Sequence, residues 1–289
     1  MKLKKNHFAR KHREENLFKF LMIFSFCLMA GVLCFILGTV IVKGLPSLSW
    51  SMITKTPKGG YYLGKEGGIL NAIIGSLYLA GGGTLLAMII GIPLALLKDT
   101  YARRTKLAGF IRLSLDILWG VPSIVYGAFG FAIMIAFQMR ASLLCGIIVL
   151  SLLELPIMTR AMDEVLTMTP RDLSHASYAL GATRLETSFR VVARQIIPGI
   201  VTAVLLAFGR GIGDAASVLF TAGYTDRIPT SLTRPAASLP LAVFFQLGTP
   251  FPEVQKRAYA AALILTIIVL AVSLGSRWIS SRLSRHIVK

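Results

Sequence analysis

The stretch ILNAIIGSLYLAGGGTLLAMIIGIPLALL, from Ile69 to Leu97, contains no charged side chain. A helix of about 20 apolar residues crosses the hydrocarbon core of a bilayer, so this stretch is long enough to span it. Three other blocks share this character: Phe20 to Val42, Ile117 to Met139 and Ala258 to Ser276. Two more carry isolated charges: Ala141 to Thr159, with Glu154, and Gln195 to Thr225, with Arg210 and Asp214. The sequence therefore predicts an all-α polytopic membrane protein with six transmembrane helices.

The composition and the distribution of charge agree with this fold class. Hydrophobic residues make up 55% of the chain and charged residues 15%, too little polar surface to cover a soluble globule. The net charge of +18 is also typical of nucleic-acid-binding proteins. However, segments 1–19, 98–106, 159–195 and 277–289 hold 20 Lys and Arg, against 9 in segments 43–68, 138–140 and 224–257. Cytoplasmic loops carry such an excess, so we expect both termini in the cytoplasm and no nucleic acid as partner.

These spans divide the chain into successive segments. We expect a basic cytoplasmic tail (1–16), a first transmembrane helix (17–43), an extracytoplasmic loop (44–68), a transmembrane domain (69–280) and a second cytoplasmic tail (281–289). The three cysteines fall inside apolar blocks and are interpreted as small hydrophobic residues. Four scattered histidines form no pattern typical of a metal site.

The segment 170–194 is too polar for a span and is patterned as a bent helix pair. Pro170 suits the start of a helix and Gly181 its C-terminal cap, and a second short helix is expected from about Thr183. Ala176, Ala179 and Leu180 recur at helical spacing. Such a pair would either dock on a protein partner or rest on the membrane surface. The absence of lysine between Lys106 and Lys256 favours the protein partner.

Proline and glycine mark two further features of the spans. Pro122, in GVPSIVYG (Gly120 to Gly127), removes a helical hydrogen bond inside the third span. The break either aids packing or faces a water-filled path. Gly81-Gly82-Gly83 in the second span permits close contact with another helix.

Several of these stretches resemble known sequences. ASYALGATRLET (Ala176 to Thr187), continuing to Gly199, resembles the cytoplasmic EAA loop of ABC importer permeases, with His175 in place of the leading Glu and Ala193-Arg194 in place of the closing Leu-Pro. Over about residues 40 to 285 the chain resembles the A-type phosphate permeases of the Pst system. GVPSIVYG is one of the stretches that carry this resemblance. Three later stretches share this resemblance: RGIGDAA from Arg210, LFTAG from Leu219 and ASLP from Ala237.

The resemblance implies a type I ABC importer permease fold with a cytoplasmic coupling helix. It implies that the chain forms half of the translocation path of an ATP-driven phosphate importer in the bacterial inner membrane. Ala176, Ala179, Leu180 and Gly181 would dock on the ATPase. The implied partners are a C-type permease, two copies of an ATP-binding subunit, an extracytoplasmic phosphate-binding protein and the lipid bilayer.

ATP and Mg²⁺ would bind to the ATPase subunits. This chain contains no G-x-x-x-x-G-K-[ST] sequence, so we expect it to be a transport subunit without a cofactor and not an enzyme.

Intramembrane charges are the candidate substrate path. Arg210 and Asp214 are four residues apart on a helix, so they can pair. The pair either staples two helices together or lets Arg210 bind an anion while Asp214 orients it. The resemblance implies the second role. In the family that this chain resembles, Glu is usual at the position of Asp214. Arg160 either reaches the headgroups from a helix end or, as the resemblance implies, forms part of the path. For Glu154 the sequence gives no account.

Two alternatives for the function stay open at this point. A permease of the same fold could import another anion, such as sulfate, molybdate or phosphonate. An ATP-independent secondary transporter or channel belongs to a different class, and many such transporters carry an inverted repeat. We see no such repeat in this sequence.

Overall fold

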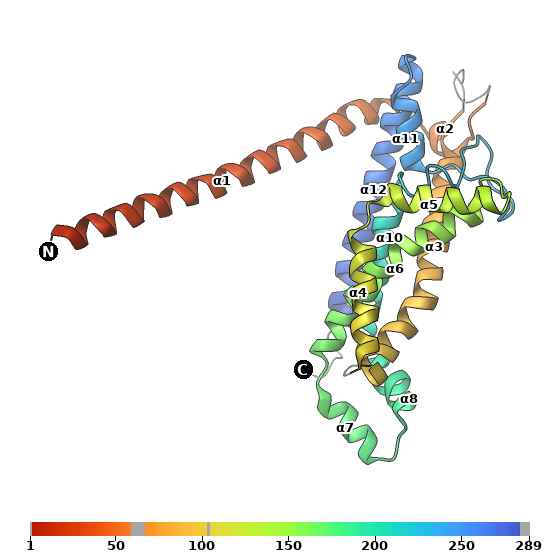
Figure 1. Ribbon diagram of the computed structural model, residues 1–289. Coiled ribbons are helices and arrows are strands. Elements are labelled where there is room, and N and C mark those ends of the chain that lie inside the picture. Colours follow the sequence, from red (N-terminus) through yellow and green to blue (C-terminus); the bar gives the residue numbers. More distant parts are fainter. Residues whose placement is uncertain (1, 59–66, 103–104, 284–289) are drawn as a thin grey trace.

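The computed structural model describes residues 2–58, 67–102 and 105–283, and all regular elements within these ranges are helical (Figure 1). The long helices are α1 (Lys2–Gly44), α3 (Leu70–Leu97), α6 (Leu143–Met168), α10 (Ile197–Ile212) and α12 (Pro252–Leu283). The shorter helices are α2 (Trp50–Thr54), α4 (Lys106–Gly120), α5 (Ser123–Ala136), α7 (Arg171–Ala179), α8 (Arg184–Glu186), α9 (Ala193–Gln195) and α11 (Leu239–Leu247). A 3-10 turn covers Leu45–Ser47 (η1), and π-helical segments cover Lys98–Ala102 (η2) and Thr187–Val192 (η3).

Six spans result if bent helices are counted together. Four helical stretches are long and apolar enough to cross a membrane: Glu14–Ser47, Leu70–Tyr101, Leu143–Met168 and Pro252–Arg282. Two bent pairs pass the same test together: α4 with α5, at 100°, and Arg184–Gln195 with α10, at 73°. Two of the six expected spans are therefore broken.

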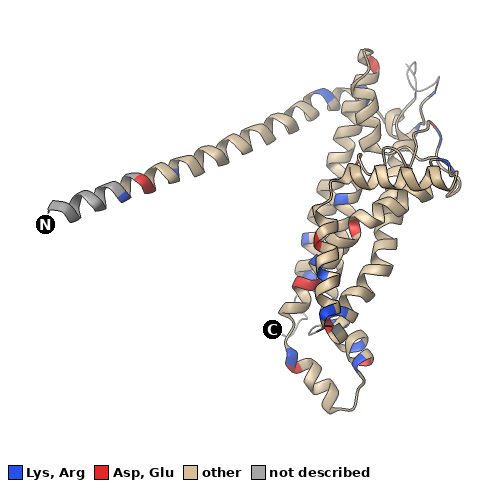
Figure 2. Ribbon diagram, in the orientation of Figure 1, with Lys and Arg blue, Asp and Glu red and all other residues tan. Residues whose placement is uncertain are grey.

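Helix α1 extends away from the bundle over most of its length (Figure 1). It begins at Lys2, so residues 2–16 of the segment expected as a separate tail are part of the helix. Its apolar stretch buries no residue, and no charge interrupts it between Lys19 and Lys43 (Figure 2). Contact is made at its C-terminal end, where the Lys43 ammonium lies 4.9 Å from the ring centroid of Tyr259 in α12. The surface of α1 is thus free to face lipid or another subunit.

The centre of the bundle is the packing of α3 against α6. A Cβ at Gly82 would collide with Ile147, and one at Gly83 would come within 3.2 Å of Leu150. A Cβ at Gly81 would have no neighbour within 4 Å. Two of the three glycines therefore serve the close contact predicted from the sequence.

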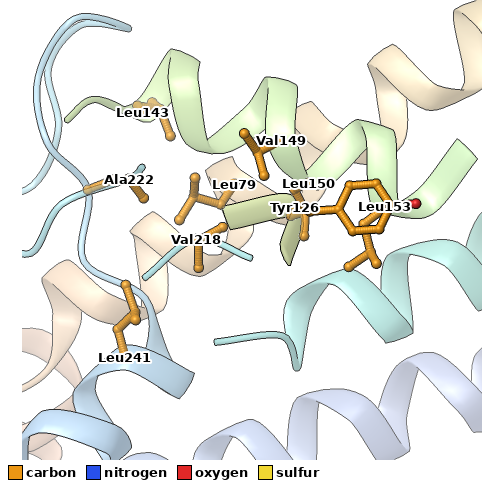
Figure 3. Close-up of a cluster of buried hydrophobic side chains, with 10 residues drawn as sticks. Leu79, Tyr126, Leu143, Val149, Leu150, Leu153, Val218, Ala222 and Leu241 are labelled. Carbon is orange, nitrogen blue, oxygen red and sulfur yellow. The ribbon is translucent and has the colours of Figure 1, made fainter. Parts of the chain in front are cut away.

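A buried apolar cluster joins this helix pair to the elements around it (Figure 3). Leu79 of α3 and Leu150 of α6 lie at its middle, and Tyr126 of α5, Val218 of the chain after α10 and Leu241 of α11 contribute from other elements. Burying large apolar side chains removes their surface from the surrounding solvent and fixes the elements against one another. The irregular segment 213–238 is therefore part of the core.

The third expected span, Ile117 to Met139, is broken at Pro122 as the sequence indicated, and its two helices meet at 100°. α4 ends at Gly120, Val121 is extended (φ −75°, ψ 127°), and α5 begins at Ser123. Proline lacks an N–H and disfavours the helical region for the residue before it, which accounts for the break. The Tyr126 hydroxyl donates a hydrogen bond of 2.7 Å to the carbonyl oxygen of Leu118, which holds α5 against α4 across the bend.

The fifth expected span, Gln195 to Thr225, is too long. Its helix α10 ends at Ile212, and Gly213 caps it. Residues 214–238 run on in turns and irregular chain. Asp214 therefore lies just after the helix and not inside it.

Candidate functional site

A cavity of about 600 Å³ lies at the bend between α4 and α5. Its wall includes the end of α4, the GVPS turn, Leu153 and Pro156 of α6, and Arg210 of α10. Arg210 is the charged side chain among the described residues that line it. The GVPSIVYG stretch and Arg210, which are 88 residues apart measured from Pro122, are thus brought together in one place.

The N-terminal end of α5 adds positive potential to this cavity. α5 has 14 residues, and Pro122 and Ser123 at its start line the cavity. The first N–H groups of a helix have no intrahelical acceptor and carry a partial positive charge. The cavity therefore combines a guanidinium with a helix N-terminus, two features that favour an anion.

Asp214 holds Arg210 in place. Arg210 Nη1 lies 3.2 Å from Asp214 Oδ2, and the Ser217 backbone N–H donates to Asp214 Oδ1 at 3.0 Å. The Asp214 side chain is 2% exposed, whereas that of Arg210 is 49% exposed. One edge of the guanidinium is thus paired while the remainder is open. The pair joins α10 to the turn that follows it, so it does not staple two helices together.

Arg160 is also paired with a carboxylate. Its Nη2 bonds to Asp116 Oδ1, which links α6 to α4. The two side chains are 40% and 39% exposed. Arg160 follows Pro156 and Ile157, which line the cavity, by about one helical turn. The structure therefore brings Arg160 to the edge of the same region, but not into the cavity wall beside Arg210.

Sequence reasoning missed Asp116. It directly precedes the charge-free block that was taken as the third span and lies outside the basic loop 98–106, so it was given no role. A signal was available, because Asp116 is flanked by Leu115 and Ile117 and interrupts an apolar run. A carboxylate in such a run needs a cationic partner.

Glu154 is fully buried at the junction of α3, α6 and α10. Within the described part of the chain, neither of its carboxyl oxygens has a hydrogen-bond partner that meets standard geometry, although Thr84 of α3 faces the group. Its carboxyl occupies the space next to Gly211, where a Cβ would overlap Oε1. Glu154 thus packs directly behind the residue that follows Arg210.

Comparison with known proteins identifies the group to which this arrangement belongs. A family model described as binding-protein-dependent transport system inner membrane component matches residues 83–289. The phosphate transport system permease protein PstA of Haemophilus influenzae is 34% identical over 85% of this chain and 86% of its own length. PstA of Yersinia pestis is 34% identical over 86% of this chain and 84% of its own length.

The chain belongs to this family of inner-membrane permeases. Membership confirms the resemblance drawn from the EAA-like, GVPSIVYG and LFTAG stretches. It also makes the alternative of an ATP-independent secondary transporter wrong. Permeases of this family work with a substrate-binding protein, an ATPase and a second permease.

A solved structure confirms the fold. A chain of the methionine ABC transporter MetNI, in an inward-facing conformation, superposes with a TM-score of 0.62 at 17% identity. The alignment covers 74% of this chain and 95% of that chain. The all-helical permease fold expected from the sequence is therefore confirmed.

The EAA-like segment of this permease lies beyond the ends of the spans (Figure 1). Gly181 has a φ of +84°, which favours glycine, and the Thr183 and Glu186 side chains form a capping box at the start of α8. The Ser177 and Thr187 hydroxyl oxygens, 2.9 Å apart and buried, join the two arms. The helix cap and the second helix predicted from the sequence are thus confirmed.

The four residues expected to dock on the ATPase form one exposed patch. Leu180 is 89% exposed, and Ala176, Ala179 and Gly181 are exposed as well. The position of the segment past the helix ends, away from the apolar sides of the bundle, favours a protein partner over the membrane surface. Docking itself stays a prediction.

Two further polar contacts, also missed from the sequence, lie where this segment meets the spans, and the first ties the segment to η2. The Thr100 hydroxyl of η2 bonds to that of Ser188 in η3 at 2.9 Å. Two residues before Thr100, the Lys98 ammonium pairs with Asp163 of α6. Both side chains of that pair are largely buried, so it locks the adjacent ends of α3 and α6 together.

Proposed function

We propose that the chain is the A-type permease subunit of an ATP-driven phosphate importer. The observation that supports this most directly is the cavity in which Arg210, half open and oriented by Asp214, lies beside the N-terminal end of α5. The two relatives above are both phosphate permeases by name. A planar guanidinium presents a fork of N–H donors that matches the oxygens of phosphate.

In this proposal the two arginines act in succession along α6 and α10. Arg210 binds the anion in the cavity, and Asp214 fixes its orientation. Arg160 receives the anion about one turn further along α6. Each arginine has an aspartate partner in the absence of substrate, so that neither site holds an uncompensated cation in the membrane.

The family and the charge distribution support the assembly proposed here. The chain pairs with a C-type permease, two ATP-binding subunits and an extracytoplasmic phosphate-binding protein. ATP and Mg²⁺ bind to the ATPase subunits, and this chain has no ATPase site of its own. Both termini face the cytoplasm of a bacterium, and the patch around Leu180 docks on the ATPase.

Radiolabelled phosphate uptake, normalised to the amount of protein in the membrane, tests the proposal. Arg210→Gln and Arg160→Gln should each assemble normally and lose most uptake. Arg210→Lys keeps the charge but loses the planar fork, so it should recover only part of the activity. Arg282→Gln, at the exposed end of α12, is the matched control and should transport normally.

Normal uptake in both glutamine variants would contradict the proposed path. Competition by excess sulfate, molybdate or phosphonate separates phosphate from the other oxyanions. If one of them is transported in place of phosphate, the path stands but the substrate is wrong.

A further inference from the structure

A second cationic cavity lies at the end of the bundle opposite α7 and α8. It has a volume of about 580 Å³ and is formed by η1, by α2 with Lys55, Lys58 and Gly67 after it, and by the first turns of α12. The charged residues among the described lining are Lys55, Lys58, Lys256, Arg257 and Glu253. This cavity shares no described lining residue with the cavity at Arg210.

Among the described residues that line this cavity, positive charges outnumber negative ones. Lys256 Nζ lies 2.9 Å from Glu253 Oε1, and both side chains are well exposed, so this pair forms a neutral rim. Lys55, Lys58 and Arg257 are then left without a carboxylate in contact among the described residues. Three positive charges around one hollow attract an anion.

Arg257 makes the cavity more than a group of surface lysines. Its residue surface is 8% exposed. Within the described ranges, no acceptor is hydrogen-bonded to its guanidinium and no carboxylate lies within ion-pair distance, although the charge of Glu253 still acts on it. A largely buried arginine without a bonded partner is costly. The anion that fills the hollow would supply that partner.

We propose that this cavity binds a phosphate group, supplied as inorganic phosphate or as the headgroup of an anionic phospholipid. Arg257 offers a planar fork of donors, Lys55 adds charge, and the Ser51 hydroxyl adds a neutral donor. The inorganic-phosphate source rests on the proposed function, because the proposed topology places this end outside the cytoplasm.

The surroundings of the cavity also suit the headgroup source. Trp50, 80% exposed, lies at the start of α2 in its wall, and the Lys43–Tyr259 contact joins the end of α1 to α12, which forms another part of the wall. Trp, Tyr and Lys gather at the headgroup level of membrane proteins. A cavity at that level would take the phosphodiester of a lipid with the same donors.

The experiment uses the assembled transporter in nanodiscs without its binding protein. Arg160→Gln and Arg210→Gln are introduced first, to remove the proposed path, and equilibrium binding of radiolabelled inorganic phosphate is measured. Adding Arg257→Gln should weaken the remaining binding by at least about tenfold, the loss of a charge-assisted hydrogen bond. Lys55→Gln, at an exposed position, should weaken it by about threefold. Arg277→Gln, an exposed arginine on the same helix, is the control and should change nothing.

Lipid is tested in the chain that keeps Arg160 and Arg210. Native mass spectrometry compares retention of phosphatidylglycerol with that of a glycolipid that lacks phosphate. Arg257→Gln and Lys55→Gln should lose the retained phosphatidylglycerol, whereas Arg277→Gln should keep it.

The outcomes are separable. A change in either assay at Arg257 and Lys55, with none at Arg277, supports the proposal and names the source. No change in both assays overturns it, and so does an effect confined to capture of the binding protein, which would make the cavity a protein contact. If Arg210→Gln loses uptake but phosphate still binds at the cavity around Arg257, both the proposed path and this cavity are supported.

Discussion

Replacing Gly211 by alanine tests the packing behind Arg210. A Cβ on Gly211 would overlap Glu154 Oε1, lie 2.9 Å from Cδ of the same carboxyl and lie 3.5 Å from Leu150 Cδ2. Glu154 is fully buried, so its side chain has little room to move away. Either α10 shifts or Glu154 adopts a strained rotamer, and overpacking of this kind typically costs about 1–3 kcal/mol.

Gly209→Ala is the matched control for this change. A Cβ there would have as its nearest contact Val272 Cγ1, at 3.9 Å. Both substitutions place alanine in the same helix, and both gain up to about 1 kcal/mol of helix propensity. The difference between the two variants therefore isolates the overpacking, about 1–3 kcal/mol in favour of Gly209→Ala.

Thermal unfolding of the purified permease, followed by size-exclusion chromatography of the heated protein, measures this difference. Gly211→Ala should unfold several degrees below Gly209→Ala, and its phosphate uptake should fall because Arg210 is the adjacent residue. Adding Glu154→Ala should recover part of the loss by removing the obstructing carboxyl. If Gly211→Ala unfolds with Gly209→Ala, the packing described here is wrong.

Three other predictions concern the charges and the EAA-like segment 170–194, the proposed coupling segment. Exchanging Arg210 and Asp214 should abolish uptake, since the cation would then leave the cavity wall, and an active exchange variant would contradict the path. Gly181→Val should cost about 1–2 kcal/mol locally because of the positive φ, and co-purification of the ATPase should fall while the bundle stays folded. Asp116→Asn should change stability by less than about 1 kcal/mol, because the pair with Arg160 is half exposed. It should still alter the concentration dependence of uptake, and an unchanged dependence would argue against a role for the pair in transport.

The sequence predicted the continuous spans well because their signal is local. Charge-free blocks such as Ile69 to Leu97 need no partner to be recognised, and the structure has helices α1, α3 and α12 where three such blocks were expected. The cap at Gly181 was also predictable, since a left-handed residue at a helix end has its own sequence signature.

The bend at Pro122 shows where such prediction stops. The proline announces a break, but the angle of 100° depends on what α5 lies against. A Cβ at Gly127 would come within 2.7 Å of the carbonyl oxygen of Ala216, so α5 packs on the backbone of the chain after α10. That contact joins residues far apart in the sequence, and periodicity carries no information about it.

The same limit applies to the candidate site. Arg210 and Asp214 were predicted to pair because helical spacing brings residues four apart together. Asp116 and Arg160 are separated by 44 residues and meet through the packing of α4 on α6. A single charge in an apolar run tells that a partner exists without telling which residue it is.

The contacts of the coupling segment indicate how a movement there would reach the arginines. The chain leads from this segment into α10 through a bend of 73° at Ile196, so the two parts do not form one straight helix. The side-chain route is more direct, because Ser188 bonds to Thr100, and Lys98, two residues earlier, pairs with Asp163 of α6.

Asp163 and Arg160 are three residues apart on α6, and residues at this spacing lie on neighbouring positions of one helix face. Helix α6 continues from there past Pro156, in the wall of the cavity, to Glu154 behind Gly211. One helix thus contacts the link from the coupling segment, carries one proposed path arginine and packs behind the other. These contacts give a displacement of η3 a route to α6, in addition to the chain that joins η3 to α10.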